Sequence, residues 1–300
     1  YSIQRLCSML KTHYLHLFNR LFAIQLFIIW LLGCIGVFGS DLTETLWPSV
    51  LTGGIFWILL VACSKLPKWQ SPRFYWVGLL QLIACWSIFP LFKAIRIHFY
   101  SWSADHLLYT IDSYLWLNKS LPEHMIALQA PWFSELIAFC YFSFYFLVIG
   151  SALFFFLQRK KNTSEHYFLG LMLMYFFGFI GYFILPAVGP YGAFPTLFTY
   201  PVHNGAMTLF LTGMVEKGIT GMDVFPSLHT GITLYIVGFL FKTGYRKIAW
   251  CLTPLAAGLI VATVYLHYHY GIDVIVGALL ALLVLHFLFK KKKVENGTHL

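Results

Sequence analysis

Two short polar groups lie within an otherwise apolar sequence, and their residue types are those of nucleophilic and acid–base chemistry. His269 and Asp273 are four residues apart within the segment 263–277, and His229 closes the sequence Phe-Pro-Ser-Leu-His at 225–229. Four residues make about one helical turn, so the carboxylate could hold one ring nitrogen of His269 and leave the other free to react. We expect the two segments to meet in space and to form one site.

The residues around His229 predict the start of a helix. Proline suits the first turn of a helix, and a serine such as Ser227 suits its N-cap. The free backbone N–H groups and the positive dipole end of such a helix favour a phosphate group, so Ser227, Leu228 and the adjacent backbone are candidates for binding it. A histidine in that first turn could protonate a leaving oxygen, which makes His229 a candidate general acid.

Simpler interpretations exist for each group. His269 could be a histidine at the membrane interface, Asp273 could cap the helix that follows, and 226–229 could be an ordinary helix start. A metal site is a further alternative, with His229, His267, His269 and Asp273 as its ligands. On a helix, however, the side chains of His267 and His269 would point in different directions. The prediction is therefore a site without a metal or another cofactor.

The elements that position these residues are expected to be membrane helices. The chain of 300 residues is 59% hydrophobic and only 10% charged, with a mean hydropathy of +0.75. A soluble domain carries roughly a quarter charged residues. Eight apolar segments are long enough to span a bilayer, which takes about 20 residues. They predict an all-α integral membrane protein, a bundle of about eight transmembrane helices at 21–39, 47–64, 74–92, 132–157, 167–185, 226–241, 248–266 and 272–289.

The same pattern divides the chain into five parts. A basic amphipathic segment is expected at 1–20, three N-terminal transmembrane helices at 21–92, and an extracytoplasmic connection of amphipathic helices at 93–131. The catalytic transmembrane core is expected at 132–289 and a basic cytoplasmic tail at 290–300.

The charges predict which side of the membrane each connection faces. If the eight segments alternate, 16 of the 20 Lys and Arg residues fall on the side that holds both termini. The positive-inside rule then places both termini in the cytoplasm, and His229 and His269 at the opposite, extracytoplasmic face. Of the 11 acidic residues, 9 also lie on that face, including Asp223 and Asp273. No soluble basic domain is present, so we expect no nucleic acid partner; the oligomeric state is left open.

The two motifs together resemble those of the phosphatidic acid phosphatase type 2 superfamily of membrane lipid phosphatases and phosphotransferases. Pro226-Ser227-Leu228-His229 is similar to its second motif, Pro-Ser-Gly-His, and His269 to Asp273 is similar to its third, which ends His-x-x-x-Asp. The resemblance implies the superfamily's helical catalytic core around 226–277. It also implies that His269 attacks phosphorus to form a phosphohistidine, that Asp273 orients His269, and that His229 protonates the leaving group.

Two departures from the superfamily's pattern carry information about the substrate. The region expected to hold its first motif, 181–194, contains no Lys or Arg, and Thr263 stands where the third motif opens with Ser-Arg. A phosphomonoester carries nearly two negative charges and most needs such cations, whereas a phosphodiester carries one.

Both departures also occur in the motifs of the inositol phosphorylceramide synthase branch, which this sequence resembles. The segment that contains Asp105, Asp112 and Pro122, and Tyr141 in the fourth predicted span, also resembles that branch. That resemblance implies transfer of a phosphate-bearing head group from a membrane phospholipid to a lipid alcohol, with Thr263 beside the substrate. A lipid phosphatase using water, a lipid transporter with a His/Asp proton relay and a non-catalytic scaffold are alternatives. Asp112 and Glu135 could bind a polyol or cap helices.

Overall fold

The protein is described here from a computed structural model, which covers residues 2–65, 74–158 and 161–290. These residues form α-helices and no strand, so the all-α prediction is confirmed for them. The helices are α1 (Ser2–Phe38), α2 (Thr43–Lys65), α3 (Phe74–Ile88), α4 (Leu91–Phe99), α5 (Asp105–Leu115), α6 (Leu121–Ile126), α7 (Pro131–Gln158), α8 (Lys161–Ile184), α9 (Pro190–Ala193), α10 (Ala206–Gly218), α11 (Leu228–Lys242), α12 (Arg246–Tyr265) and α13 (Gly271–Phe289).

Within the described parts of the chain, six helices are long and apolar enough to cross a membrane, and a seventh crossing results if α3 and α4 count as one bent span. The six lie within α1, α2, α7, α8, α12 and α13, and α3 and α4 meet at an angle of 50°. The sixth predicted span, 226–241, corresponds to α11, which has 15 residues and a length of about 22 Å, less than the roughly 30 Å of a hydrocarbon core. Phe225 and Pro226 extend the apolar run in the sequence, but they lie in a loop before this helix.

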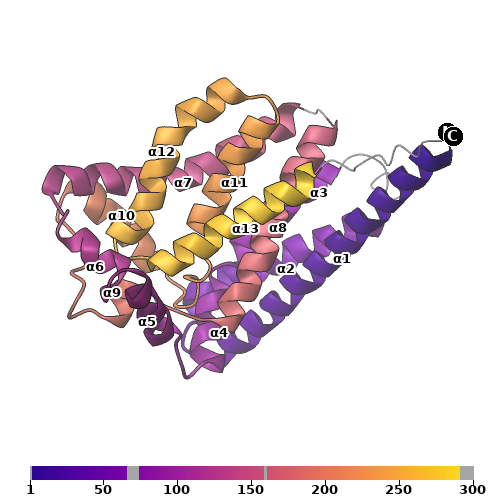
Figure 1. Ribbon diagram of the computed structural model, residues 1–300. Helices are drawn as coiled ribbons and strands as arrows, with labels where there is room; N and C mark the ends of the chain where they lie inside the picture. Colours follow the sequence, from indigo (N-terminus) through magenta and orange to yellow (C-terminus); the bar gives the residue numbers. More distant parts are fainter. Residues whose placement is uncertain (1, 66–73, 159–160, 291–300) are drawn as a thin grey trace.

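The helix α11 lies at the centre of the bundle. It packs against α13, α12, α8 and α7, and its Ile232, Tyr235, Ile236 and Phe239 are buried in the largest apolar core. The first three spans form a second group, in which α1 packs against α2 and α4, and α3 joins this group to α8 (Figure 1). Because lipid replaces water around such a bundle, many of the large apolar side chains on α1, α2, α7 and α13 remain exposed.

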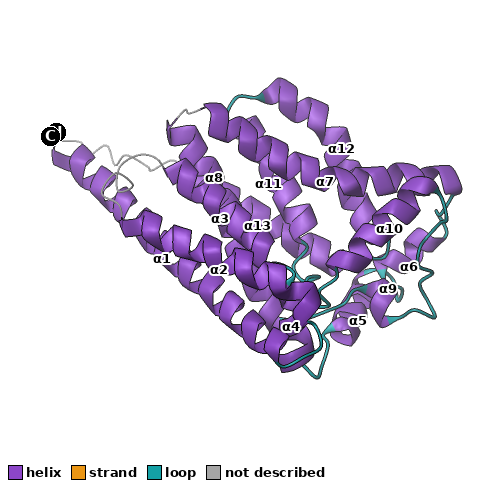
Figure 2. Cartoon of the chain, turned by 180° about the vertical axis from the view of Figure 1, so that it is seen from behind, coloured by secondary structure: helices purple, strands orange, loops and turns teal. Residues whose placement is uncertain are grey.

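The short helices lie together at one end of the bundle. The helices α4, α5, α6 and α9 and most of the loops gather there, beside the junction of α12 and α13 (Figures 1 and 2). The predicted connection at 93–131 thus contains short helices. Residues 2–20 of the predicted segment at 1–20 form the first turns of α1, which continues without a break into the first span. Of the predicted tail at 290–300, all but Lys290 lies outside the described residues.

Candidate active site

His269 and Asp273 lie on either side of the start of α13. His269 belongs to the turn that connects α12 and α13, and Asp273 is the third residue of α13. The Nδ1 atom of His269 lies 3.6 Å from Oδ2 of Asp273, an ion-pair contact longer than a hydrogen bond, and both side chains are buried. The same Oδ2 accepts a hydrogen bond of 2.8 Å from the backbone N–H of Tyr270. Asp273 therefore caps α13, as one interpretation of the sequence had it, and also lies beside His269.

His229 faces His269 from the neighbouring helix. It is the second residue of α11, and the centroids of the two imidazole rings are 5.8 Å apart. Tyr141 stacks on the ring of His229 at 4.8 Å, and Phe144 contacts it at 4.4 Å, so α7 holds this side chain in place. Two histidines separated by 40 residues in the sequence thus lie at one site, as the motifs predict.

A close crossing of α11 and α13 brings the two motifs together. The backbone N–H of Ser227 donates a hydrogen bond of 3.1 Å to the carbonyl of Asp273. Gly277 lies one turn further along α13, and a Cβ atom at this position would lie 2.3 Å from the carbonyl oxygen of Ser227. Only a glycine permits this approach of the two backbones.

Of the three predicted substrate-binding residues, only Leu228 lines the cavity beside the histidines. Ser227 is fully buried, and its hydroxyl caps α11 by accepting the N–H of Thr230 at 3.3 Å. Thr263 is also fully buried, and its hydroxyl donates to the carbonyl of Ile260 at 2.7 Å. The carbonyl of Thr263 accepts the N–H groups of Tyr268 and His269, so this residue holds the turn that carries the nucleophile candidate. In this geometry Ser227 and Thr263 position the two histidines.

A cavity of about 260 Å³ opens beside the two histidines. Its lining residues include no Lys or Arg, and Asp223 is the one carboxylate among them. Asp223 lies in the loop before α11, where the hydroxyl of Thr220 donates a hydrogen bond to it. Asp223 was predicted to lie on the same side of the membrane as the histidines, but it was not among the predicted site residues. Its position six residues before His229 is the one signal in the sequence that could have identified it.

Burial favours the neutral form of His269. Removal from water lowers the pKa of its imidazole to about 4, although the carboxylate of Asp223 and a backbone hydrogen bond with Val224 oppose this shift. A neutral imidazole has a free lone pair, so His269 can act as a nucleophile at neutral pH. Burial also raises the pKa of Asp223, and the nearby His269 partly offsets that effect.

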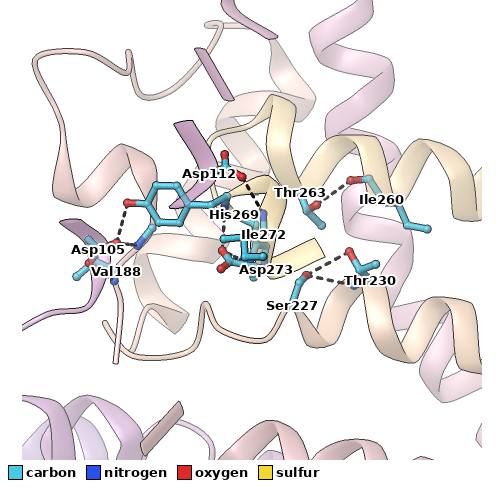
Figure 3. A network of polar contacts seen from close by, with 12 residues as sticks. Asp105, Asp112, Val188, Ser227, Thr230, Ile260, Thr263, His269, Ile272 and Asp273 are labelled. Atoms are coloured by element: carbon cyan, nitrogen blue, oxygen red, sulfur yellow. Dashed lines mark hydrogen bonds and ion pairs between the residues drawn. The ribbon is translucent and has the colours of Figure 1, made fainter. Parts of the chain in front are cut away.

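Two buried aspartates on α5 fix the backbone around the site (Figure 3). The carboxylate of Asp105 accepts hydrogen bonds of 2.9 Å from the N–H groups of Val188 and Gly189 and from the hydroxyl of Tyr270. Asp112 accepts the N–H of Ile272, in the first turn of α13, at 2.8 Å. Asp112 thus caps a helix, one of the two roles that the sequence suggested.

Glu135 has the same capping role. It accepts the N–H groups of Met207 and Thr208 at the start of α10, at 2.7 and 3.1 Å.

The region expected to hold the first motif, 181–194, lies against the turn that carries His269. The N–H of Tyr191 donates to the carbonyl of His267 at 3.1 Å, and Val188 and Tyr191 line the cavity.

The metal alternative depends on four residues that do not gather as a ligand set. In the described parts of the chain, no group of three or more His, Cys, Asp or Glu side chains is arranged to hold a metal ion. His267 instead places its Nε2 atom 3.0 Å from the side-chain amide nitrogen of Gln129. Its ring also packs against Phe198, with the ring centroids 4.8 Å apart.

Comparison with known proteins agrees with this geometry. The family model of the PAP2 superfamily, the phosphatidic acid phosphatase type 2 superfamily, matches residues 106–287, which include both histidines and Asp273. No curated protein and no solved structure matches the chain. Membership of this superfamily supports a lipid phosphatase or phosphotransferase function in general. The match covers more than half of the chain, and the protein therefore belongs to the PAP2 superfamily.

Proposed function

We propose that this protein transfers the phosphate-bearing head group of a membrane phospholipid to a lipid alcohol, as in the inositol phosphorylceramide synthase branch. The observation that carries the proposal is the pair of facing imidazoles beside a cavity whose lining residues include no Lys or Arg. A dianionic phosphomonoester would be poorly stabilised there, whereas a phosphodiester brings a single negative charge.

The reaction has two steps. In the first, the free ring nitrogen of His269 forms a bond to phosphorus, the ester bond to the diacylglycerol oxygen breaks, and His229 gives its proton to that oxygen. In the second, His229 takes the proton of the acceptor hydroxyl, the new phosphorus–oxygen bond forms, and the phosphorus–nitrogen bond breaks. Asp273 stabilises the positive charge that His269 carries in the intermediate, and no cofactor is required.

The position in the membrane is part of the proposal. Both termini would face the cytoplasm and the cavity the opposite side. In support, α11 begins at the site and ends at Lys242, and α12 begins with Arg246 and Lys247, so these cations lie at the end of the bundle away from the site.

The test uses purified protein in mixed micelles, with phospholipids labelled at phosphorus, in the presence and absence of a lipid alcohol. We expect a new lipid that carries the label, and a labelled protein intermediate that is stable in base and labile in acid. His269→Ala should lower turnover at least about 10³-fold and remove the protein label. His286→Ala is the matched control, because His286 is exposed on α13.

Other outcomes identify the alternatives. Free phosphate or a free phosphorylated head group, formed at the same rate without the alcohol, would make the protein a hydrolase that uses water. Movement of lipid across a vesicle without covalent change would indicate a transporter. Activity of His269→Ala above half that of the parent protein would refute the nucleophile assignment.

A further inference from the structure

The cavity beside the histidines is aromatic and contains one acid. Nine of its lining residues are aromatic, six of them tyrosines, and its other lining residues apart from Asp223, His229 and His269 are apolar. The aromatic residues are Trp86, Phe89, Tyr141, Phe144, Tyr145, Tyr175, Tyr182, Tyr191 and Tyr268. Several of these rings contact one another: Tyr268 contacts both Tyr141 and Tyr191, and Trp86 contacts Tyr145.

Asp223 lies among these rings. Asp223 lines the same cavity as Tyr141, Tyr145, Tyr182, Tyr191 and His269. The hydroxyl of Thr220 donates a hydrogen bond to its carboxylate. This acid is not required by the two-step reaction above, in which Asp273 serves the nucleophile.

The charges in the cavity restrict what can bind there. A phosphodiester beside His269 places a negative charge in the same cavity as Asp223, and like charges repel strongly away from water. Arg96 of α4 lies beside Gly221 in the loop that carries Asp223, but it donates to the carbonyl of Tyr100 and does not line the cavity. A substrate that carries its own positive charge removes this repulsion, since carboxylates and the faces of aromatic rings both attract cations.

We propose that Asp223 and the aromatic wall form a binding site for the ammonium group of a zwitterionic phospholipid head group. The inference rests on the proposed function and names its donor, a phosphodiester of an amino alcohol such as choline or ethanolamine. The phosphate then lies beside His269 and the ammonium beside Asp223. In the superfamily's pattern, basic side chains of the first motif supply the positive charge beside the phosphate. Here the ammonium group of the substrate would supply that charge.

The first experiment compares donors that differ only in the head group. Phosphatidylcholine, phosphatidylethanolamine, phosphatidylglycerol and phosphatidylinositol with identical acyl chains are supplied to the full-length protein in micelles. We expect kcat/KM to be at least about tenfold higher for the zwitterionic donors, the size of one favourable cation contact. The comparison of kcat/KM for phosphatidylcholine and phosphatidylethanolamine shows which of the two zwitterionic head groups is preferred.

Substitution of the carboxylate tests the assignment to Asp223. Asp223→Asn should lower kcat/KM for the zwitterionic donors about tenfold or more and raise it for the anionic donors, because the repulsion is lost. Asp223→Glu, which keeps the charge, should retain the preference for zwitterionic donors. Asp41→Asn is the matched control, because Asp41 is exposed in the turn after α1.

Binding to an inactive protein separates the failure of this inference from that of the proposed function. His269→Ala protein is titrated by calorimetry with dihexanoyl lipids of the same four head groups. Tighter binding of the zwitterionic lipids, lost in His269→Ala/Asp223→Asn, supports the ammonium site even if no transfer occurs. Equal or tighter binding of the anionic lipids, or a preference that Asp223→Asn leaves unchanged, overturns it even if transfer occurs.

Discussion

At the scale of single residues, the environment of His269 sets the protonation state that the reaction needs. The ring is 3% exposed, and burial lowers its pKa to about 4. An ordinary histidine has a pKa of about 6.5 and would be partly protonated in mildly acidic conditions.

The first prediction concerns the pH profile of the attack on phosphorus. With a p-nitrophenyl phosphodiester that lacks an amine, kcat/KM should stay constant as the pH falls from 7 to about 5, and should decrease as it falls through about 4. The reason is that His269 remains neutral until its lowered pKa is reached. A decrease centred near pH 6.5 would show that the imidazole is not desolvated.

The second prediction separates the two histidines. His229→Ala should lower turnover of a phospholipid at least about 10²-fold, because the alkoxide then leaves without a proton. The release of p-nitrophenol from the aryl diester in the first turnover should change much less, since this leaving group needs no proton. His269→Ala should abolish both reactions, and stopped-flow absorbance measures the difference. Equal losses for both substrates in His229→Ala would contradict its role as the general acid.

At the scale of elements, the site depends on how closely α11 and α13 cross. The spacing of His269 and Asp273 is local, but the distance from either residue to His229 is set by the contact of Gly277 with the carbonyl of Ser227. The N–H of Ser227 and the carbonyl of Asp273 join the same two helices.

The third prediction tests this crossing. In Gly277→Ala the added methyl group would lie 2.3 Å from the carbonyl oxygen of Ser227, so α13 must shift away from α11. We expect loss of most activity and a lower melting temperature in detergent. Gly150→Ala on α7 is the control, because a Cβ there meets no atom within 4 Å, and its melting temperature should be unchanged or slightly higher. Full activity in Gly277→Ala would show that the close approach is not needed.

At the scale of the whole molecule, the cavity uses helices that the family match leaves out. Trp86, Phe89 and Pro90 lie at the end of α3 and at its bend towards α4, before residue 106 where the match begins. The side chain of Trp86 donates a hydrogen bond of 2.8 Å to the hydroxyl of Tyr175 on α8. The N-terminal helices therefore complete the wall of a cavity whose two histidines lie in the matched region.

The fourth prediction concerns the orientation in the membrane. A cysteine introduced at Asp41 should react with a membrane-impermeant maleimide in intact cells, whereas one at Lys242 should react only after permeabilisation. Both positions are exposed at opposite ends of the bundle. The labelling of the parent protein, which carries Cys251 in an exposed position, is the background to subtract. The reverse pattern would invert the proposed topology.

The sequence by itself determined the membrane class, the positions of the main helices and the three catalytic candidates. Hydropathy and motif spacing are local properties, so His269, Asp273 and His229 could be identified without a fold. The number of spans could not be settled in the same way, because the apolar run at 226–241 includes loop residues before α11.

The tertiary structure alone decided which residues face the cavity. Ser227 and Thr263 turn inward to hold helix ends, whereas Asp223 and Tyr141 face the cavity. The sequence places Ser227, Thr263 and Asp223 in or near the motifs and Tyr141 on a distant helix, but the direction of each side chain depends on packing against helices far away in the chain, such as α3 and α7. Packing between distant segments, which no local pattern encodes, therefore selects the residues that line the cavity.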